Sequence, residues 1–268
     1  MVIDDKHHLV FVHIPKCAGT SVRRALRPLD CSNGAFAELA DHPQMGRIHL
    51  AHLSLADLAA FFPDAFAKVR DYTAFAIMRD PADRFLSAIF QRLREFGGVA
   101  QSDFTAAMIR DEAISVRRQL EAPQRLAAEL VHFTRQCDFV EHSGQRLVPH
   151  IFSVRQMTEV SRFVFERTGI EIGREKHNRT TVVRMGALRP LQRALRRPYA
   201  RHVTAERRQA VREWMMRAGF YKDLPKQSFA LDPATDAFVR AYYERDFTLL
   251  AEVEGAPHAA AATGEVTA

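Results

Sequence analysis

The chain has 268 residues, of which 47% are hydrophobic and 26% charged, and its formal net charge at pH 7 is +6. These proportions are typical of a soluble globular protein and exclude a disordered chain or a membrane-embedded body. No apolar stretch approaches the roughly 18 uninterrupted residues of a membrane span. The positive charge indicates an anionic partner. We expect one domain over residues 1–255 and a disordered tail over 256–268, where alanine is frequent.

The three cysteines do not suggest a structural framework. Cys17, Cys31 and Cys137 are irregularly spaced and contain no CxxC pair, so the sequence predicts neither disulfides nor a zinc site. An odd number of cysteines fits a reducing compartment. We therefore expect a cytoplasmic protein.

Strands and helices alternate along the chain. Apolar stretches bounded by turn residues predict strands over 8–14, 72–78 and 147–154. Apolar residues at helical spacing predict helices from Gly19, over 54–62, from Pro81, in patches at 103–110 and 123–131, over 156–168 and over 232–250. Capping residues at Ser54, Asp80 and Gly169 support three of these boundaries, and the turn sequences CSNG and DHPQ predict a loop before Ser54. The alternation favours an α/β fold with a central parallel sheet flanked by helices.

The stretch after the first strand, HIPKCAGTS at 13–21, has the composition of a phosphate-binding turn. Lys16 supplies a cation, and Gly19 lets the backbone approach a ligand. Thr20 and Ser21 supply hydroxyl groups at a helix N-terminus, where free N–H groups favour an anion. The nucleoside-triphosphate loop GxxxxGK[ST] differs, because here the first glycine is missing and the lysine precedes the glycine. The alternative is a structural helix start with a lysine nearby.

A second polar element, RDPADRFLSAI at 79–89, follows the second strand. Arg79 would leave the carboxyl end of that strand, and Ser87 would lie about 10 Å further along the next helix. An arginine folding back beside this helix could share one phosphate with the serine hydroxyl. Because the carboxyl ends of parallel strands face one crevice, Lys16 and Arg79 are expected on the same side of the sheet. Asp83 and Arg84 are expected to form a surface ion pair.

The two motifs together resemble those of sulfotransferases that use 3′-phosphoadenosine 5′-phosphosulfate (PAPS), in the branch of bacterial proteins and Golgi carbohydrate sulfotransferases. HIPKCAGTS resembles the 5′-phosphosulfate loop HIPKTAGTS, and RDPADRFLSAI resembles the 3′-phosphate motif RDPxxRxxSxY. Weaker similarities follow at 52–55 (HLSL), 132–140 (HFTRQCDFV), 176–180 (KHNRT) and 243–250 (YERDFTLL). The resemblance implies a three-layer α/β fold like that of P-loop nucleotide-binding domains.

The resemblance also implies which residues bind the donor. The 5′-phosphosulfate would be held by Lys16, Cys17, Ala18, Gly19, Thr20 and Ser21. The 3′-phosphate would be held by Arg79 and Ser87, and Asn178 and Arg179 would lie near the nucleotide. No metal is implied.

The catalytic groups follow from the same resemblance. Lys16 would stabilise the negative charge that grows on the leaving phosphate. A general base must take the proton of the attacking alcohol, and His52 is the first candidate and His49 the second. The implied reaction is in-line sulfuryl transfer to a hydroxyl group of a small molecule or glycan, expected to be a carbohydrate or glycolipid.

Other functions stay open at this stage. The arginine-rich stretch 189–208 is either a solvated helix face or a guide for an anionic acceptor. Nucleic acid is not expected, because Tyr199 alone gives no stacking platform. A P-loop-like phosphotransferase is disfavoured by the missing GK[ST] and by the lack of a clear acidic magnesium ligand. A noncatalytic protein that binds nucleotides or anionic glycans is the second alternative.

Overall fold

The computed structural model describes residues 1–37, 39–99, 101–122, 128–173, 181–183, 221–223 and 231–255, and the single residues 211, 214, 218 and 229. Two compact units divide the chain, one of residues 1–174 with 231–268 and one of residues 175–230. The single domain expected over 1–255 stays a prediction. The tail at 256–268 and the arginine-rich stretch 189–208 lie outside the described residues.

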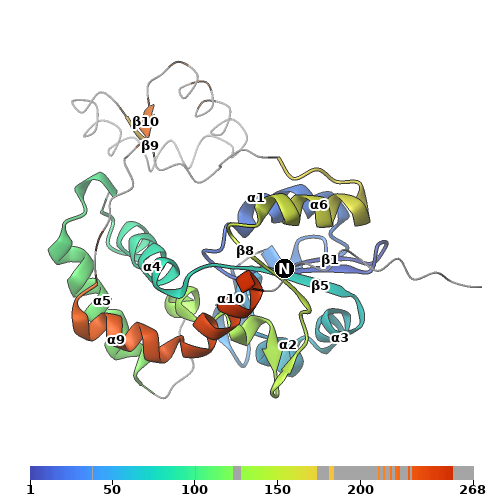
Figure 1. The fold of residues 1–268 in the computed structure, drawn as a ribbon, viewed down its shortest axis with the longest axis horizontal. Helices are drawn as coiled ribbons and strands as arrows, with labels where there is room; N and C mark the ends of the chain where they lie inside the picture. The colour runs from blue at the N-terminus through green and yellow to red at the C-terminus, as the bar shows by residue number, and fades with distance from the viewer. Residues whose placement is uncertain are drawn as a thin grey trace, which may run out of the picture. The chain divides into compact units, whose positions relative to one another are not determined.

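The first unit contains a four-stranded sheet with the order β1-β2-β5-β8 (Figure 1). Strands β2 (Leu9–Val12), β5 (Thr73–Met78) and β8 (His150–Ser153) are parallel. Strand β1 (Val2–Asp4) pairs antiparallel with β2 at the edge. The three predicted strands are confirmed with shorter bounds. The sequence analysis missed β1, because three residues are too few for a periodic signal.

Helices cover both faces of this sheet. Helices α1 (Gly19–Leu26) and α6 (Met157–Thr168) lie on one face, and α2 (Leu55–Phe61) and α3 (Pro63–Asp71) lie on the other (Figure 1). Helix α10 (Glu244–Gly255) packs against β8. The mostly parallel sheet with helices on its two faces confirms the α/β prediction. Among the described residues, no helix has the length and apolar character needed to cross a lipid bilayer.

Three further helices pack on one another: α4 (Pro81–Glu95), α5 (Ala106–Leu120) and α9 (Pro233–Tyr242). The patch predicted at 103–110 is therefore part of a longer helix. Of the patch predicted at 123–131, residues 123–127 lie outside the described part and Ala128–Phe133 form a 3-10 helix. The single helix predicted over 232–250 is wrong, since α9 ends at Tyr242 and α10 begins at Glu244.

Several short elements were not predicted. The expected loop before Ser54 contains a hairpin of β3 (Leu39–His42) and β4 (Gly46–His49), and α3 was missed. In the second unit, β9 (Thr181–Val183) pairs antiparallel with β10 (Tyr221–Asp223). The predicted caps at Ser54, Asp80 and Gly169 are confirmed.

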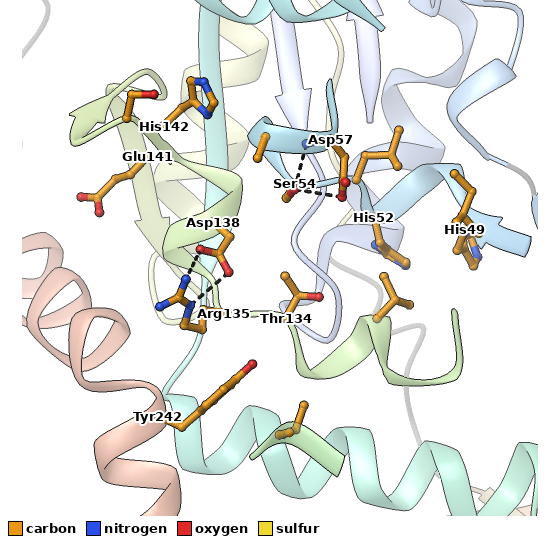
Figure 2. Close-up of a pocket in the computed structure, with 16 residues that line it drawn as sticks. His49, His52, Ser54, Asp57, Thr134, Arg135, Asp138, Glu141, His142 and Tyr242 are labelled. Carbon is orange, nitrogen blue, oxygen red and sulfur yellow. Dashed lines mark hydrogen bonds and ion pairs between the residues drawn. The ribbon is translucent and has the colours of Figure 1, made fainter. Parts of the chain in front are cut away.

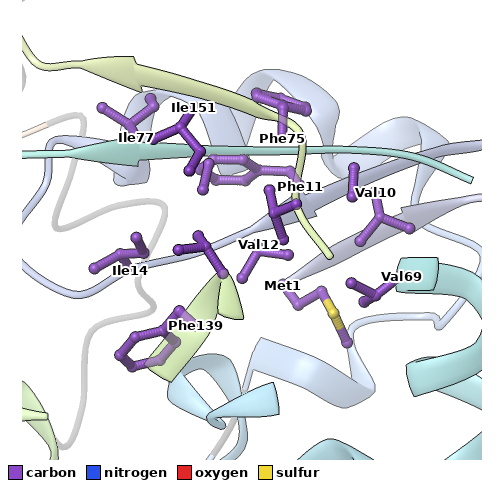
Figure 3. Packing of buried hydrophobic residues seen from close by; sticks show 14 of the residues in the cluster. Met1, Val10, Phe11, Val12, Ile14, Val69, Phe75, Ile77, Phe139 and Ile151 are labelled. Atoms are coloured by element: carbon purple, nitrogen blue, oxygen red, sulfur yellow. The ribbon is translucent and has the colours of Figure 1, made fainter. Parts of the chain in front are cut away.

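The core fixes the strands on which the site depends. Phe11 of β2 and Phe75 of β5 are register partners (Figure 3), and their ring centroids are 4.9 Å apart. The ring centroid of Phe163 in α6 lies 5.2 Å from that of Phe75. Side chains alternate along a strand, so Val10 and Val12 point to the opposite face, and both are buried. Because the sheet is buried on both faces, the loops that leave β2 and β5 start from rigid positions.

Candidate functional site

The loop after β2 turns through an unusual backbone conformation before α1 begins. Lys16 and Ala18 are both left-handed, with φ of 66° and 58°, and Ala18 is the N-cap of α1. Such residues cost about 1–3 kcal/mol each unless glycine occupies the position, so the surrounding structure must hold them in place. A backbone in which left- and right-handed residues alternate can turn successive N–H groups toward a common side and bind an anion there. The predicted helix start at Gly19 is confirmed.

The first turn of α1 packs against the end of β2 on one side and faces solvent on the other. A Cβ atom at Gly19 would lie 2.4 Å from Cδ2 and 2.8 Å from Nε2 of His13, so only glycine fits there. Thr20 is exposed and Ser21 is half-buried. The packing of Gly19 against His13 therefore explains the spacing of these two residues in HIPKCAGTS. Thr20 and Ser21 lie on the side of the helix that is accessible to a ligand.

The side chain of Lys16 extends to α4. Its Nζ donates a hydrogen bond to Oε1 of Gln91 at 2.8 Å. Burial, with a smaller repulsion from Arg94, lowers the pKa of Lys16 to about 8. Among the described residues, this ammonium group forms no ion pair with a carboxylate. A partly buried cation that lacks an anionic partner is typical of a ligand site.

Gln136 connects the loop after β2 to the loop after β5. Its Oε1 accepts hydrogen bonds from Sγ of Cys17 at 3.2 Å and from the backbone N–H of Arg79 at 3.0 Å. Its Nε2 donates to the carbonyl oxygen of Arg79 at 2.8 Å. Gln136 is completely buried. The two motif loops therefore lie at the same edge of the sheet, as the sequence predicted for Lys16 and Arg79.

The segment that carries Gln136 is held by two buried residues near the end of the chain. The carboxylate of Asp246 accepts hydrogen bonds from the backbone N–H groups of Gln136 at 2.7 Å and of Cys137 at 2.8 Å. The hydroxyl of Tyr243 donates to the carbonyl oxygen of Phe133 at 2.7 Å. The two weakly similar segments, 132–140 and 243–250, thus contact each other, and these hydrogen bonds hold the backbone of Gln136 in place.

Arg84 is buried, so its predicted surface ion pair with Asp83 is wrong. Its guanidinium group donates to the carbonyl oxygens of His132 at 3.0 Å and Thr134 at 2.7 Å, and it lies 5.2 Å from the ring centroid of Tyr243. The relative exposure of Arg84 is 0%. An arginine on an amphipathic helix is usually solvated, and only these long-range partners explain why this one is not.

The residues predicted to hold a 3′-phosphate lie on and before α4. Arg79 pairs with Asp83 at 3.2 Å, and their side chains are 25% and 57% exposed. Such a solvated pair contributes little stability, so the guanidinium can exchange Asp83 for another anion. Ser87 is half-buried in α4. Asn178 and Arg179 lie outside the described residues.

Four histidines gather beside the Lys16 loop. The ring centroid of His52 lies 4.8 Å from that of His13, 4.7 Å from that of His49 and 5.4 Å from that of His132. Burial holds the pKa values of His13 and His52 well below 6.5 and lowers the pKa of His132 to about 3. Lys16 also lowers the pKa of His132, so the cluster lies within the electrostatic field of the loop.

The hydrogen bonds of His52 and His49 fix different tautomers. Nδ1 of His52 lies 3.2 Å from the carbonyl oxygen of His13, which can only accept, so Nδ1 carries the proton and Nε2 has a free lone pair. Nδ1 of His49 accepts from the backbone N–H of Ala51 at 3.3 Å, so the proton of its neutral ring is on Nε2. His52 can therefore accept a proton through Nε2, whereas His49 can donate a hydrogen bond.

Both histidines line a pocket of about 570 Å³ (Figure 2). The other walls come from Ser54 and Asp57 at the start of α2, from the segment 131–143, and from Tyr242 at the end of α9. Lys16 and Arg79 do not belong to its lining, so the pocket lies on the histidine side of the motif loops. No local sequence pattern predicts this pocket, because its walls are distant in the chain. Within the described residues, no group of three or more His, Cys, Asp or Glu side chains is arranged to hold a metal ion.

A family model with the description "Sulfotransferase family" matches residues 1–251. The match spans both motif loops, the histidine cluster and the segment that contains Asp246. Comparison with curated proteins and with solved structures found no match.

Replacing Gln136 by leucine should lower the free energy of unfolding by roughly 2–4 kcal/mol, because three hydrogen bonds are lost and the backbone groups of Arg79 lose their partners. Urea denaturation measures this change. Gln119→Leu is the matched control, since the amide of Gln119 donates to the carbonyl and hydroxyl oxygens of Ser115 in the same helix, and about 0.5 kcal/mol or less is expected. Equal effects of the two substitutions would contradict the connecting function of Gln136.

The histidine cluster should make the fold sensitive to acid. In the unfolded chain these histidines bind protons near pH 6.5, whereas in the folded chain their pKa values are lower, so unfolding takes up protons. Stability is therefore lost as the pH falls below about 6.5, by up to about 1.4 kcal/mol per pH unit for each histidine. For His132 the loss continues toward its folded pKa of about 3.

Urea denaturation at pH 7.5, 6.5 and 5.5 checks this expectation by comparing the wild type with His132→Gln. The variant should lose less stability on acidification. Gln119→Leu, which removes no titratable group, should keep the pH dependence of the wild type. If His132→Gln and the wild type have the same pH dependence, His132 does not stay uncharged in the fold.

Proposed function

Because the chain belongs to the sulfotransferase family, we propose that it transfers a sulfuryl group from PAPS to a hydroxyl group of a carbohydrate or glycolipid. Family membership supports sulfuryl transfer in general, and the donor, the acceptor and the residue roles are the proposal. One observation in the structure is the main support for this proposal. The partly buried ammonium of Lys16, without a carboxylate partner among the described residues, lies in a left-handed loop that Gln136 ties to Arg79.

The chemistry of the two loops fits a nucleotide with two separate anionic groups. Lys16 and the N–H groups at the start of α1 would hold the 5′-phosphosulfate, as cations and helix N-termini do for phosphates. Arg79 and Ser87 would hold the 3′-phosphate, with Asp83 released from its ion pair. Asn178 and Arg179 are proposed as further nucleotide contacts. The corresponding fold is a three-layer, P-loop-like α/β domain.

The donor supplies the sulfuryl group, whose S–O bond to the phosphate breaks as a new bond forms to the acceptor oxygen. Lys16 stabilises the charge that appears on the departing phosphate oxygen. His52 takes the proton of the acceptor hydroxyl on Nε2, and its Nδ1–H bond to the carbonyl oxygen of His13 stabilises the charged ring that results. His49 donates its Nε2–H to the acceptor and orients it. These tautomers favour His52 over His49 as the base.

Calorimetric titration with 3′-phosphoadenosine 5′-phosphate tests the donor site. The wild type should bind this bisphosphate without added metal, and Arg79→Ala should weaken binding roughly 10- to 100-fold, because a charge-assisted contact is lost. Arg70→Ala should have no effect, since Arg70 is exposed and pairs with its neighbour Asp71.

A parallel titration with magnesium ATP distinguishes a sulfotransferase from a phosphotransferase. Preferential binding of magnesium ATP would overturn the sulfotransferase proposal in favour of a phosphotransferase. Bisphosphate binding that Arg79→Ala leaves unchanged would remove the assigned 3′-phosphate site.

A further inference from the structure

We propose, on the basis of the function proposed above, that the pocket beside His49 and His52 binds the acceptor as a neutral or amine-bearing sugar unit and disfavours acidic saccharides. The pocket has a volume of about 570 Å³ and both histidines line it (Figure 2). This volume lies within the range of about 300–1,000 Å³ that is usual for small-molecule sites. An acceptor hydroxyl in the pocket would lie beside the ring assigned as the base.

The charged side chains of the pocket have the wrong sign for an anion. Three carboxylates line it, those of Asp57, Asp138 and Glu141, but only one guanidinium group, that of Arg135. Taken over its aspartate, glutamate, lysine and arginine side chains, the described lining therefore has an excess of negative charge. A carboxylate or sulfate on the acceptor would be repelled in this partly desolvated space.

The single arginine of the lining is already engaged. Arg135 donates to both carboxylate oxygens of Asp138, with distances of 3.1 and 2.9 Å (Figure 2). Arg245, which contacts Glu141 from outside the lining, also pairs with Glu252 at 2.9 Å. An acidic acceptor would have to break one of these pairs to find a cation, whereas a neutral acceptor would leave them intact.

The uncharged part of the lining suits a sugar ring. The hydroxyl group of Thr134 and the carboxylates can bond to sugar hydroxyls, and Leu120 and Val131 provide an apolar wall. The ring of Tyr242 is held by a stacked contact with Phe238, at a centroid distance of 5.3 Å. A rigid aromatic ring beside polar groups matches a molecule that has hydroxyls on its rim and C–H groups on its faces.

The positive net charge of the chain indicates an anionic partner, and one interpretation of the arginine-rich stretch 189–208 is a guide for an anionic acceptor, whereas the pocket leads to the opposite expectation for the acceptor. In the described part of the site, the cations Lys16 and Arg79 lie outside the pocket lining, at the proposed donor loops. The negative pocket and the positive donor loops would thus separate the two substrates by charge.

Three probes test the proposal: methyl β-glucoside, methyl β-glucosaminide and methyl β-glucuronide. Each of the last two differs from the glucoside in one substituent, an amine in the glucosaminide and a carboxylate in the glucuronide. Their binding is measured by ligand-observed NMR titration of the full chain saturated with 3′-phosphoadenosine 5′-phosphate. We expect the glucoside and the glucosaminide to bind and the glucuronide to bind about tenfold more weakly or worse. Asp138→Asn should reduce the difference in affinity between the glucoside and the glucuronide about fivefold, because it removes one negative charge that repels the glucuronide. Asp71→Asn, an exposed substitution in α3, should leave this difference unchanged.

Two results would overturn the proposal. One is binding of the glucuronide that equals or exceeds that of the glucoside, and the other is the absence of binding by all three sugars. The bisphosphate titration in the same samples keeps the two proposals apart. Bisphosphate binding without sugar binding removes the acceptor assignment alone, whereas sugar binding without bisphosphate binding removes the proposed sulfotransferase function.

Discussion

The hydrogen bonds of the Gln136 carboxamide are the constraint on which the site depends. One side chain contacts Cys17 in the loop after β2 and both backbone polar groups of Arg79 in the loop after β5. The strands place both loops at one edge of the sheet, and among the described residues this buried amide bonds directly to both of them. Asp246 in turn fixes Gln136, so residues near the end of the chain determine the geometry of loops near its beginning.

Charge is distributed unevenly around these loops. Lys16 is a partly buried cation, and burial keeps its pKa near 8. The neighbouring histidines stay uncharged at neutral pH, because burial and their mutual proximity hold their pKa values low. In the proposed reaction Lys16 would serve the donor and a neutral imidazole would serve the acceptor. The imidazole has to be neutral, because a ring that already carries a second proton cannot act as a base.

Local sequence signals predicted the parts of the fold that local interactions determine. The three buried strands, the helix start at Gly19 and the caps at Ser54, Asp80 and Gly169 follow from residues close together in the chain. Arg84 and Gln136 could not be predicted in this way, because their burial depends on partners some 50 to 110 positions distant. The placement of the Lys16 and Arg79 loops was predictable from strand order alone, whereas the pocket proposed for the acceptor, whose walls come from four separate segments, was not.

A crystal structure of the chain with 3′-phosphoadenosine 5′-phosphate bound would test the central claim most directly. This claim is that the two loops joined by Gln136 form one nucleotide site. The account predicts the 5′-phosphate within hydrogen-bond distance of Nζ of Lys16 and of the N–H groups that begin α1. It also predicts the 3′-phosphate on Arg79, with the ion pair to Asp83 broken. A nucleotide bound elsewhere, or one with its two phosphates in the reverse arrangement, would contradict the account.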